Sequence, residues 1–124
     1  GKSLIAYLLH RWNEATKKKT LLVVPTVNLV QQMRTDFIDY GYQPDLIHTI
    51  SAGASLRSDR PVTVSTWQSI YDVEDPDFFA EFEMVIGDEA HLFKAKSLTG
   101  LMERMSKTPR KIAMTGSLDG KTVH

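Results

Sequence analysis

Five short segments rich in apolar residues, separated by segments with a helical pattern of apolar residues, dominate this sequence. A continuous apolar run of this length is typical of a strand that is covered on both faces. Neighbouring parallel strands need a crossover connection, which is usually a helix. The alternation of strands and helices therefore predicts the α/β class, with a doubly wound, mostly parallel sheet. The predicted strands are residues 21–24, which form a continuous apolar run, 46–50, which is a weaker strand, 62–65, 84–86 and 111–114.

The first helix is predicted over residues 2–16, where apolar residues recur at helical spacing and indicate one buried stripe. Further helices are expected to begin after residues that can cap them, namely Thr26 or Asn28, Thr66, Asp75 and Ser97. The helix that begins after Thr26 or Asn28 should end at Gly41. The inward-facing side chains are expected to be Leu4, Ile5, Leu8, Leu9 and Trp12, then Val30, Met33, Phe37 and Tyr40, and finally Leu98, Leu101, Met102 and Met105.

The composition narrows the class of protein. With 124 residues, of which 42% are apolar, the chain has the size of one soluble domain. No apolar run approaches the roughly 20 residues of a membrane-spanning helix, so we expect a cytoplasmic location and no membrane partner. Basic and acidic residues balance at 15 each, so any contact with nucleic acid must be local. Because residue 1 is glycine, we expect a piece of a longer protein.

Polar residues beside the apolar runs are the candidates for function, because ligands bind beyond the carboxyl ends of strands in open α/β sheets. Gly1, Lys2 and Ser3 match the end of a phosphate-binding loop, where backbone N–H groups and lysine hold phosphates and serine holds magnesium. The alternative is the solvated start of a helix.

Two adjacent carboxylates, Asp88 and Glu89, follow the apolar run at 84–86. One carboxylate can hold a magnesium ion, while the other orients or deprotonates water. The alternative is a solvated acidic loop, which the preceding apolar strand and the nearby His91 disfavour. Gly87 would let the neighbouring backbone pack closely, as a crowded site requires.

Five segments together resemble successive motifs of superfamily 2 DEAH-box-type helicases, in order and in spacing. They are GKS at 1–3, PTVNL at 25–29, TWQS at 66–69, DEAH at 88–91 and TGS at 115–117. Each motif alone is weakly specific, but the ordered set spans nearly the whole chain. The resemblance implies a RecA-like P-loop NTPase lobe that binds ATP and Mg²⁺. Residues 1–124 would form part of the first RecA-like lobe, beginning within the Walker A motif, lacking the P-loop strand, and ending just after motif III.

The same resemblance implies a role for each motif. Lys2 would contact the β and γ phosphates, Ser3 and Asp88 would hold Mg²⁺, and Glu89 would activate the attacking water. Charge neutralisation and alignment would supply the catalysis. The residues that would bind the cofactor are Gly1, Lys2, Ser3, Asp88 and Glu89, and those that would couple nucleotide state to a second RecA-like lobe are His91, Thr115, Gly116 and Ser117.

Pro25, Thr26 and Thr66 resemble positions that grip the sugar-phosphate backbone of DNA, as a single strand or branched duplex, without reading its sequence. The alternative for each threonine is a plain helix cap. Trp67 could stack on a base, but an aromatic residue at the start of a short helix is more often a core anchor. His10 and His48 lack neighbours in the sequence that would make them ligands.

A more specific resemblance is to UvsW-like branched-DNA helicases of tailed phages, through PT-x-x-L-x-x-Q-M from Pro25, the small residues at 53–55, TWQ and the GSL ending. It implies the motor lobe of a DNA helicase or translocase that remodels recombination or replication intermediates in a bacterial or phage-infected cell. The alternatives are the motor lobe of a type I or III restriction enzyme, an RNA helicase, and a non-catalytic RecA-like binding lobe. The isolated chain is expected to be inactive, and neither polarity nor oligomeric state follows from the sequence.

Overall fold

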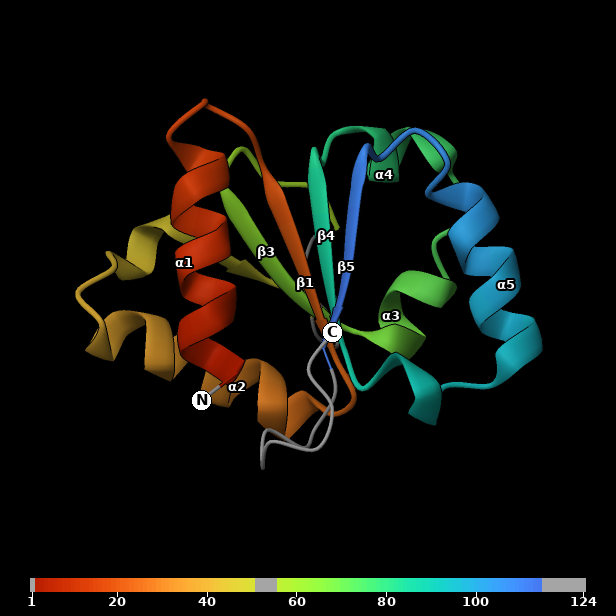
Figure 1. The fold of residues 1–124 in the computed structure, drawn as a ribbon, viewed down its shortest axis with the longest axis horizontal. Coiled ribbons are helices and arrows are strands. Elements are labelled where there is room, and N and C mark those ends of the chain that lie inside the picture. The colour runs from red at the N-terminus through yellow and green to blue at the C-terminus, as the bar shows by residue number, and fades with distance from the viewer. Residues whose placement is uncertain (1, 51–55, 115–124) are drawn as a thin grey trace.

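The computed structural model describes residues 2–50 and 56–114, and it contains one five-stranded sheet. The strand order is β2-β3-β1-β4-β5, and every neighbouring pair is parallel (Figure 1). The predicted doubly wound parallel sheet is therefore confirmed. The strands are β1 Thr20–Val24, β2 Ile47–Thr49, β3 Val62–Thr66, β4 Met84–Asp88 and β5 Arg110–Met114.

Helices cover both faces of the sheet (Figure 1). The first two helices lie on one face, and the other three lie on the opposite face. Crossovers between parallel strands are nearly always right-handed. The helices therefore lie on one face where the chain moves across the sheet in one direction, and on the other face where it moves in the opposite direction. The helices are α1 Lys2–Glu14, α2 Val27–Asp39, α3 Trp67–Tyr71, α4 Pro76–Ala80 and α5 Ala95–Arg104, with 3₁₀ turns η1 Pro44–Leu46 and η2 Ala90–Leu92.

The central strand β1 is buried along its whole length. Its side chains alternate between the two faces, so Leu22 and Val24 pack with α1 and α2, whereas Leu21 and Val23 pack with α3, α4 and α5. The continuous apolar run thus serves two hydrophobic cores at once, as predicted for a strand that is covered on both sides.

Side-chain caps fix where three of the helices begin. Thr26 Oγ1 accepts a hydrogen bond from the Leu29 N–H at 3.2 Å, and Thr66 Oγ1 accepts one from the Ser69 N–H at 3.1 Å. Asp75 caps α4 as expected. The predicted cap at Ser97 is wrong, because α5 already begins at Ala95. Such ends are the least certain part of a sequence pattern, since several consecutive residues can start a helix.

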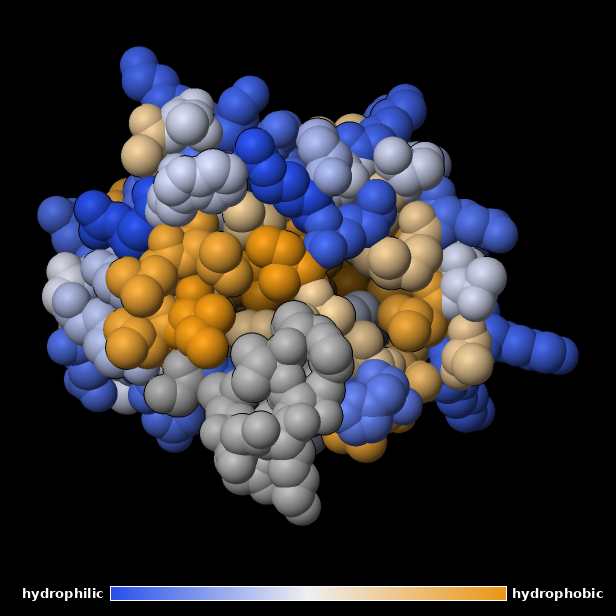
Figure 2. Space-filling model, viewed as in Figure 1, coloured by the Kyte–Doolittle hydropathy of each residue, from blue (hydrophilic) through white to orange (hydrophobic). Residues whose placement is uncertain are grey.

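The predicted inner face of α1 is wrong at four of its five positions, whereas the fifth, Leu9, is partly buried and packs against the core. Leu4, Ile5, Leu8 and Trp12 are exposed, with Leu8 at 58%, and they gather on the surface shown in Figure 2. The side chains of α1 that are fully buried are Ala6, His10 and Asn13. Tyr40 and Met102, which were also expected to face inward, are exposed as well. Among the described residues, no helix is long and apolar enough to span a membrane.

Candidate functional site

The amino end of α1 meets the carboxyl end of β4 at one edge of the sheet. Lys2 Nζ lies 2.7 Å from Asp88 Oδ1 and 3.3 Å from Glu89 Oε2, although 86 residues separate Lys2 from Asp88 in the chain. Parallel strands bring their carboxyl ends to the same edge, which is where ligands bind in folds of this class. Two segments predicted to work together are therefore in direct contact.

The charges of this cluster stabilise one another. Burial by itself would lower the pKa of Lys2, but the hydrogen bonds and negative charges of Asp88 and Glu89 outweigh it and raise that pKa. Lys2 therefore stays positively charged at neutral pH. Asp88 is only 5% exposed, so water screens its interaction with Lys2 less than it screens a surface ion pair.

Glu89 has an unusual backbone conformation. Its φ of 55° and ψ of 41° lie in the left-handed region. Among the described residues, Lys17 is the one other non-glycine residue with a positive φ. The Glu89 N–H donates to the carbonyl oxygen of Met114 at 2.9 Å, which connects Glu89 to the end of β5. Residues held in such conformations cost about 1–3 kcal/mol and cluster at functional sites.

A pocket of about 350 Å³ contains six of the eight predicted site residues that the structure describes. α2 supplies part of its wall through Leu29, Gln32 and Met33, which the sequence placed in the PT-x-x-L-x-x-Q-M pattern but did not assign to the nucleotide site. Helical spacing could have indicated Leu29 and Met33, because residues three and seven positions after Thr26 lie on the same face of the helix. The complete lining is Lys2, Ser3, Val24, Pro25, Thr26, Leu29, Gln32, Met33, Asp88, Glu89 and Leu92.

Ser3 lies in this pocket but does not contact Asp88 through a hydrogen bond. Its hydroxyl donates to Asp36 Oδ2 at 2.6 Å, and Gln32 Nε2 donates to the other Asp36 oxygen at 2.8 Å. Asp36, on α2, is therefore a neighbour of the site that the sequence did not indicate. The structure brings Ser3 and Asp88 into one pocket and leaves the Ser3 hydroxyl paired with α2.

The oxygen atoms of this pocket fit a magnesium ion that is shared with phosphates. Mg²⁺ prefers hard oxygen ligands and is usually held by one or two carboxylates together with substrate phosphates. Asp88 offers a carboxylate and Ser3 a hydroxyl. Within the described part of the chain, no group of three or more His, Cys, Asp or Glu side chains could hold a metal ion by itself. A site that is completed by phosphate oxygens agrees with that finding.

The two threonines predicted to grip a nucleic-acid backbone both serve as helix caps, which was the alternative for each. Thr26 is exposed and lines the pocket next to Pro25, whereas Thr66 is only 7% exposed. Val24 and Thr66 are paired in the register of β1 and β3, so the two caps follow neighbouring strand ends. The side chain of Thr66 is thus less accessible than the prediction assumed.

Trp67 is a core anchor, as the sequence favoured, and stacking on a base is excluded by its burial at 5% exposure. It packs against Gly87, so the close neighbour of this glycine is a side chain and not the backbone that was expected. His91 is exposed, and its Nε2 lies 3.3 Å from Glu89 Oε1. Gly1, the small residues at 53–55, and the predicted coupling residues Thr115, Gly116 and Ser117 lie outside the described residues.

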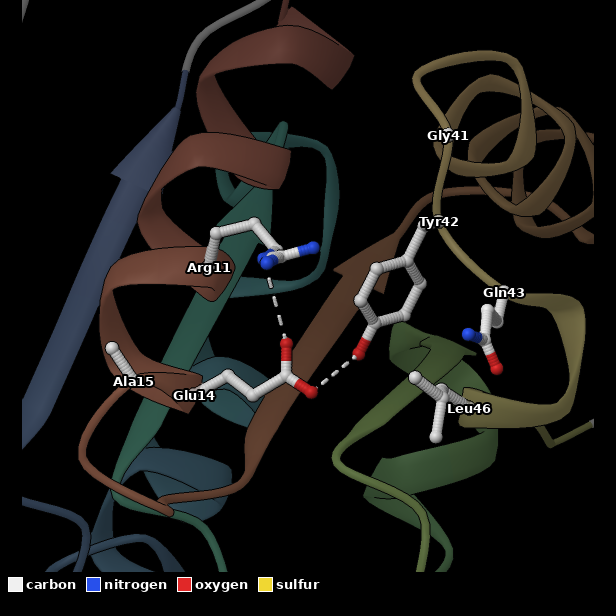
Figure 3. Close-up of a pocket in the computed structure, with 7 residues that line it drawn as sticks. All are labelled: Arg11, Glu14, Ala15, Gly41, Tyr42, Gln43 and Leu46. Carbon is white, nitrogen blue, oxygen red and sulfur yellow. Dashed lines mark hydrogen bonds and ion pairs between the residues drawn. The ribbon is translucent and has the colours of Figure 1, made fainter.

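A second pocket, of about 430 Å³, lies at the other end of α1 (Figure 3). There the Glu14 carboxylate sits between Arg11 and the hydroxyl of Tyr42 (Figure 3). None of the predicted site residues lines this pocket. Its greater volume does not make it the better candidate, because the charged cluster and the strand carboxyl ends are at the opposite edge of the sheet.

Comparison with known proteins agrees with this assignment. The chain is 40% identical over 129 aligned positions to the ATP-dependent DNA helicase uvsW of Enterobacteria phage T4, an alignment that covers 98% of the chain. The chain spans 25% of that relative's length. The crystal structure of the UvsW helicase from bacteriophage T4 superposes with a TM-score of 0.84 at 36% identity, covering 98% of this chain and 45% of the other.

A more distant structure shares the fold alone. A hypothetical ATP-dependent RNA helicase from Sulfolobus tokodaii superposes with a TM-score of 0.71 at 19% identity, covering 97% of this chain and 39% of the other. These neighbours identify the parallel sheet as a RecA-like helicase fold, as the motifs predicted. The family described as type III restriction enzyme, res subunit, matches residues 1–119, and the chain therefore belongs to that helicase family.

Proposed function

We propose that this chain is the ATP-binding part of a motor lobe, in a DNA helicase or translocase that remodels branched recombination or replication intermediates. The observation that carries the proposal is the contact of Lys2 with both Asp88 and Glu89 in one pocket, at the carboxyl edge of the sheet. A lysine at a helix start and a carboxylate pair at a strand end are the groups that phosphoryl transfer requires.

Each group has a distinct role in the proposed reaction. Lys2 exchanges its contacts with the two carboxylates for contacts with the β and γ phosphates, so its positive charge stays paired. Asp88 and Ser3 hold the metal, and Glu89 orients the attacking water and accepts its proton. When bound, Mg²⁺ neutralises charge on the phosphates. The left-handed backbone of Glu89 aims this side chain into the same pocket as Lys2.

Residues 1–124 are proposed to be part of a first RecA-like lobe, with a second lobe elsewhere in the same protein. Two features of the surface support this. Four apolar side chains of α1 are exposed together (Figure 2), and among the described strands β5 has a neighbour on one side only. Additional chain that pairs with β5 and packs on α1 would bury both. The chain's 25% share of its phage relative leaves ample room for such segments.

The proposed nucleic-acid contact is formed by Pro25, Thr26 and the start of α3 at Thr66. Their support is positional, because both threonines begin helices at neighbouring strand ends, where free N–H groups can meet phosphates. The exposed Thr26 hydroxyl is the better side-chain donor, whereas the nearly buried Thr66 would act mainly through backbone N–H groups. His91, beside Glu89, is proposed to couple nucleotide state to the second lobe, together with residues 115–117.

Branched DNA is preferred over the alternatives because of the 40% identity to uvsW, which is named as a DNA helicase. A restriction motor shares the family, and an RNA helicase shares the fold. A non-catalytic lobe is disfavoured by the intact contacts of Lys2, Asp88 and Glu89. The proposed location is the cytoplasm of a bacterial or phage-infected cell.

Glu89→Gln in the intact protein tests this function. The variant should bind ATP as wild type does and lose hydrolysis by at least about a hundredfold, because the amide cannot accept a proton from water. Lys2→Ala should weaken both binding and hydrolysis. Glu103→Gln, the same chemical change on the exposed face of α5, is the matched control and should behave as wild type. Wild-type hydrolysis by Glu89→Gln would refute the proposal.

A further inference from the structure

Trp67 connects the end of β3 with the end of β4. It is the first residue of α3, directly after Thr66, and its indole Nε1–H donates to the carbonyl oxygen of Asp88 at 2.8 Å. The bond is buried. A buried carbonyl that lost this donor would be left unsatisfied, so the bond strongly favours one orientation of the Asp88–Glu89 peptide.

The indole ring also restricts the residue before the acidic pair. A Cβ atom added to Gly87 would lie 2.5 Å from Cη2 and 2.7 Å from Cζ2 of Trp67, which is closer than real Cβ atoms approach other atoms. The six-membered part of the ring therefore rests directly on the Gly87 backbone. Phe93 stacks on the same indole at a centroid distance of 6.1 Å and an angle of 24°.

The peptide between Asp88 and Glu89 is held from both sides. Its carbonyl oxygen accepts from Trp67, and its N–H donates to the Met114 carbonyl at 2.9 Å. Rotation of this peptide would break both hydrogen bonds. These two bonds can therefore maintain the left-handed conformation of Glu89, which a non-glycine residue adopts only when its surroundings impose it.

We propose that Trp67 is a positioning residue for Glu89: by fixing the Asp88–Glu89 peptide from α3, it holds the Glu89 carboxylate beside Lys2 in the direction that water activation needs. The inference rests on the proposed function of Glu89. Trp67 does not line the pocket that contains Lys2 and Ser3. It therefore affects the geometry of the base and leaves nucleotide binding to other groups.

Trp67→Phe in the intact protein tests this inference, because phenylalanine keeps an aromatic ring and removes the N–H donor. We expect kcat for ATP hydrolysis to fall about tenfold, since misplacement by a fraction of an ångström is enough to slow a positioned reaction. The KM for ATP should stay within about twofold of wild type, provided that it reports binding. The matched control is Phe93→Leu, which loosens the packing on the indole and leaves the hydrogen bond in place.

The melting temperature and kcat of both variants are measured together. A kcat loss in Trp67→Phe that exceeds the loss in Phe93→Leu at comparable melting temperature supports the positioning role. An unchanged kcat, or losses in both variants that follow the melting temperature alone, would overturn it. Glu89→Gln distinguishes the proposed role of Glu89 from that of Trp67. If Glu89→Gln is inactive while Trp67→Phe is as fast as wild type, only the role of Trp67 fails, whereas an active Glu89→Gln removes the proposed function itself.

Discussion

Replacing His10 by glutamine is expected to change how the stability of this lobe depends on pH. His10 is fully buried, with Nδ1 2.8 Å from Thr20 Oγ1 and Nε2 2.8 Å from the Tyr42 hydroxyl. Burial first, and then the Glu14 carboxylate, raise the pKa of Tyr42, so its hydroxyl keeps its proton and can donate to Glu14 at 3.1 Å (Figure 3). Tyr42 then accepts from a neutral His10 that carries its proton on Nε2.

Protonation of His10 would disturb this arrangement. Burial, followed by the positive charge of Arg11, lowers the pKa of His10 from 6.5 to about 4. The pKa of His10 is lowered although Glu14 Oε1 lies 3.5 Å from Nε2. Above pH 6.5 the histidine is neutral in both the folded and unfolded chains, and its contribution to stability is complete. Between pH 6.5 and 4 the unfolded chain binds a proton that the folded chain rejects, so stability falls as the pH falls.

The size of the effect follows from the shift. A difference of one pKa unit corresponds to about 1.4 kcal/mol, so the change from 6.5 to about 4 removes roughly 3 kcal/mol in full. Urea unfolding at several pH values, extrapolated to zero urea, measures this free energy. His10→Gln should be less stable at pH 7, because glutamine fits the network less well, and should lose roughly 3 kcal/mol less than wild type on acidification. Parallel pH curves for the two proteins would refute the reasoning.

Three further outcomes are expected. Gly87→Ala should destabilise the lobe by about 1–3 kcal/mol in thermal unfolding, because the added Cβ would collide with the Trp67 ring. The control Gly100→Ala, at an open position in a helix, should leave the stability unchanged or raise it. Thr66→Ala should lower the DNA-stimulated ATPase of the intact protein while its basal rate barely changes, because loss of the cap displaces the backbone N–H groups at the start of α3 that are proposed to meet DNA, and a common fall in both rates would contradict that contact. DNA affinity should be independent of base sequence and should weaken with salt at a slope of about two or three neutralised phosphates, so a steep slope in filter binding would contradict local contacts.

The sheet could be predicted from the sequence because its signal is local. β1 and β4 arise from continuous apolar runs that are short enough to exclude a helix, and both strands are buried along their whole length, as such runs require. The candidate site followed for the same reason. Asp88 and Glu89 stand directly after an apolar run, and ligands bind beyond the carboxyl ends of parallel strands. The resemblance to helicase motifs assigned Lys2 to the same site, and the structure places its Nζ 2.7 Å from Asp88 Oδ1.

The orientation of α1 could not be predicted in this way. Hydrophobic periodicity assigns the inner face to Leu4, Leu8 and Trp12, yet the structure buries His10 and Asn13. Thr20 lies opposite both side chains: its hydroxyl oxygen accepts from Asn13 Nδ2 at 2.9 Å and lies 2.8 Å from His10 Nδ1, while Asn13 Oδ1 has no hydrogen-bond partner among the described residues. A buried polar network of this kind depends on partners from other elements, so no periodic pattern within the helix can reveal it.

The support of the candidate site is hidden from the sequence for a related reason. The bond from Trp67 ends on the main-chain carbonyl of Asp88, and every residue has such a carbonyl, so no residue type marks the acceptor. In the sequence, the contact is indicated by Gly87, because a residue with a side chain could not lie under the indole. A glycine directly before two carboxylates, with a tryptophan after a neighbouring strand, is thus the pattern from which such a support could be sought in related chains. The polar groups that perform chemistry can be recognised by residue type, whereas the groups that aim them must be found by following each main-chain hydrogen bond to its donor.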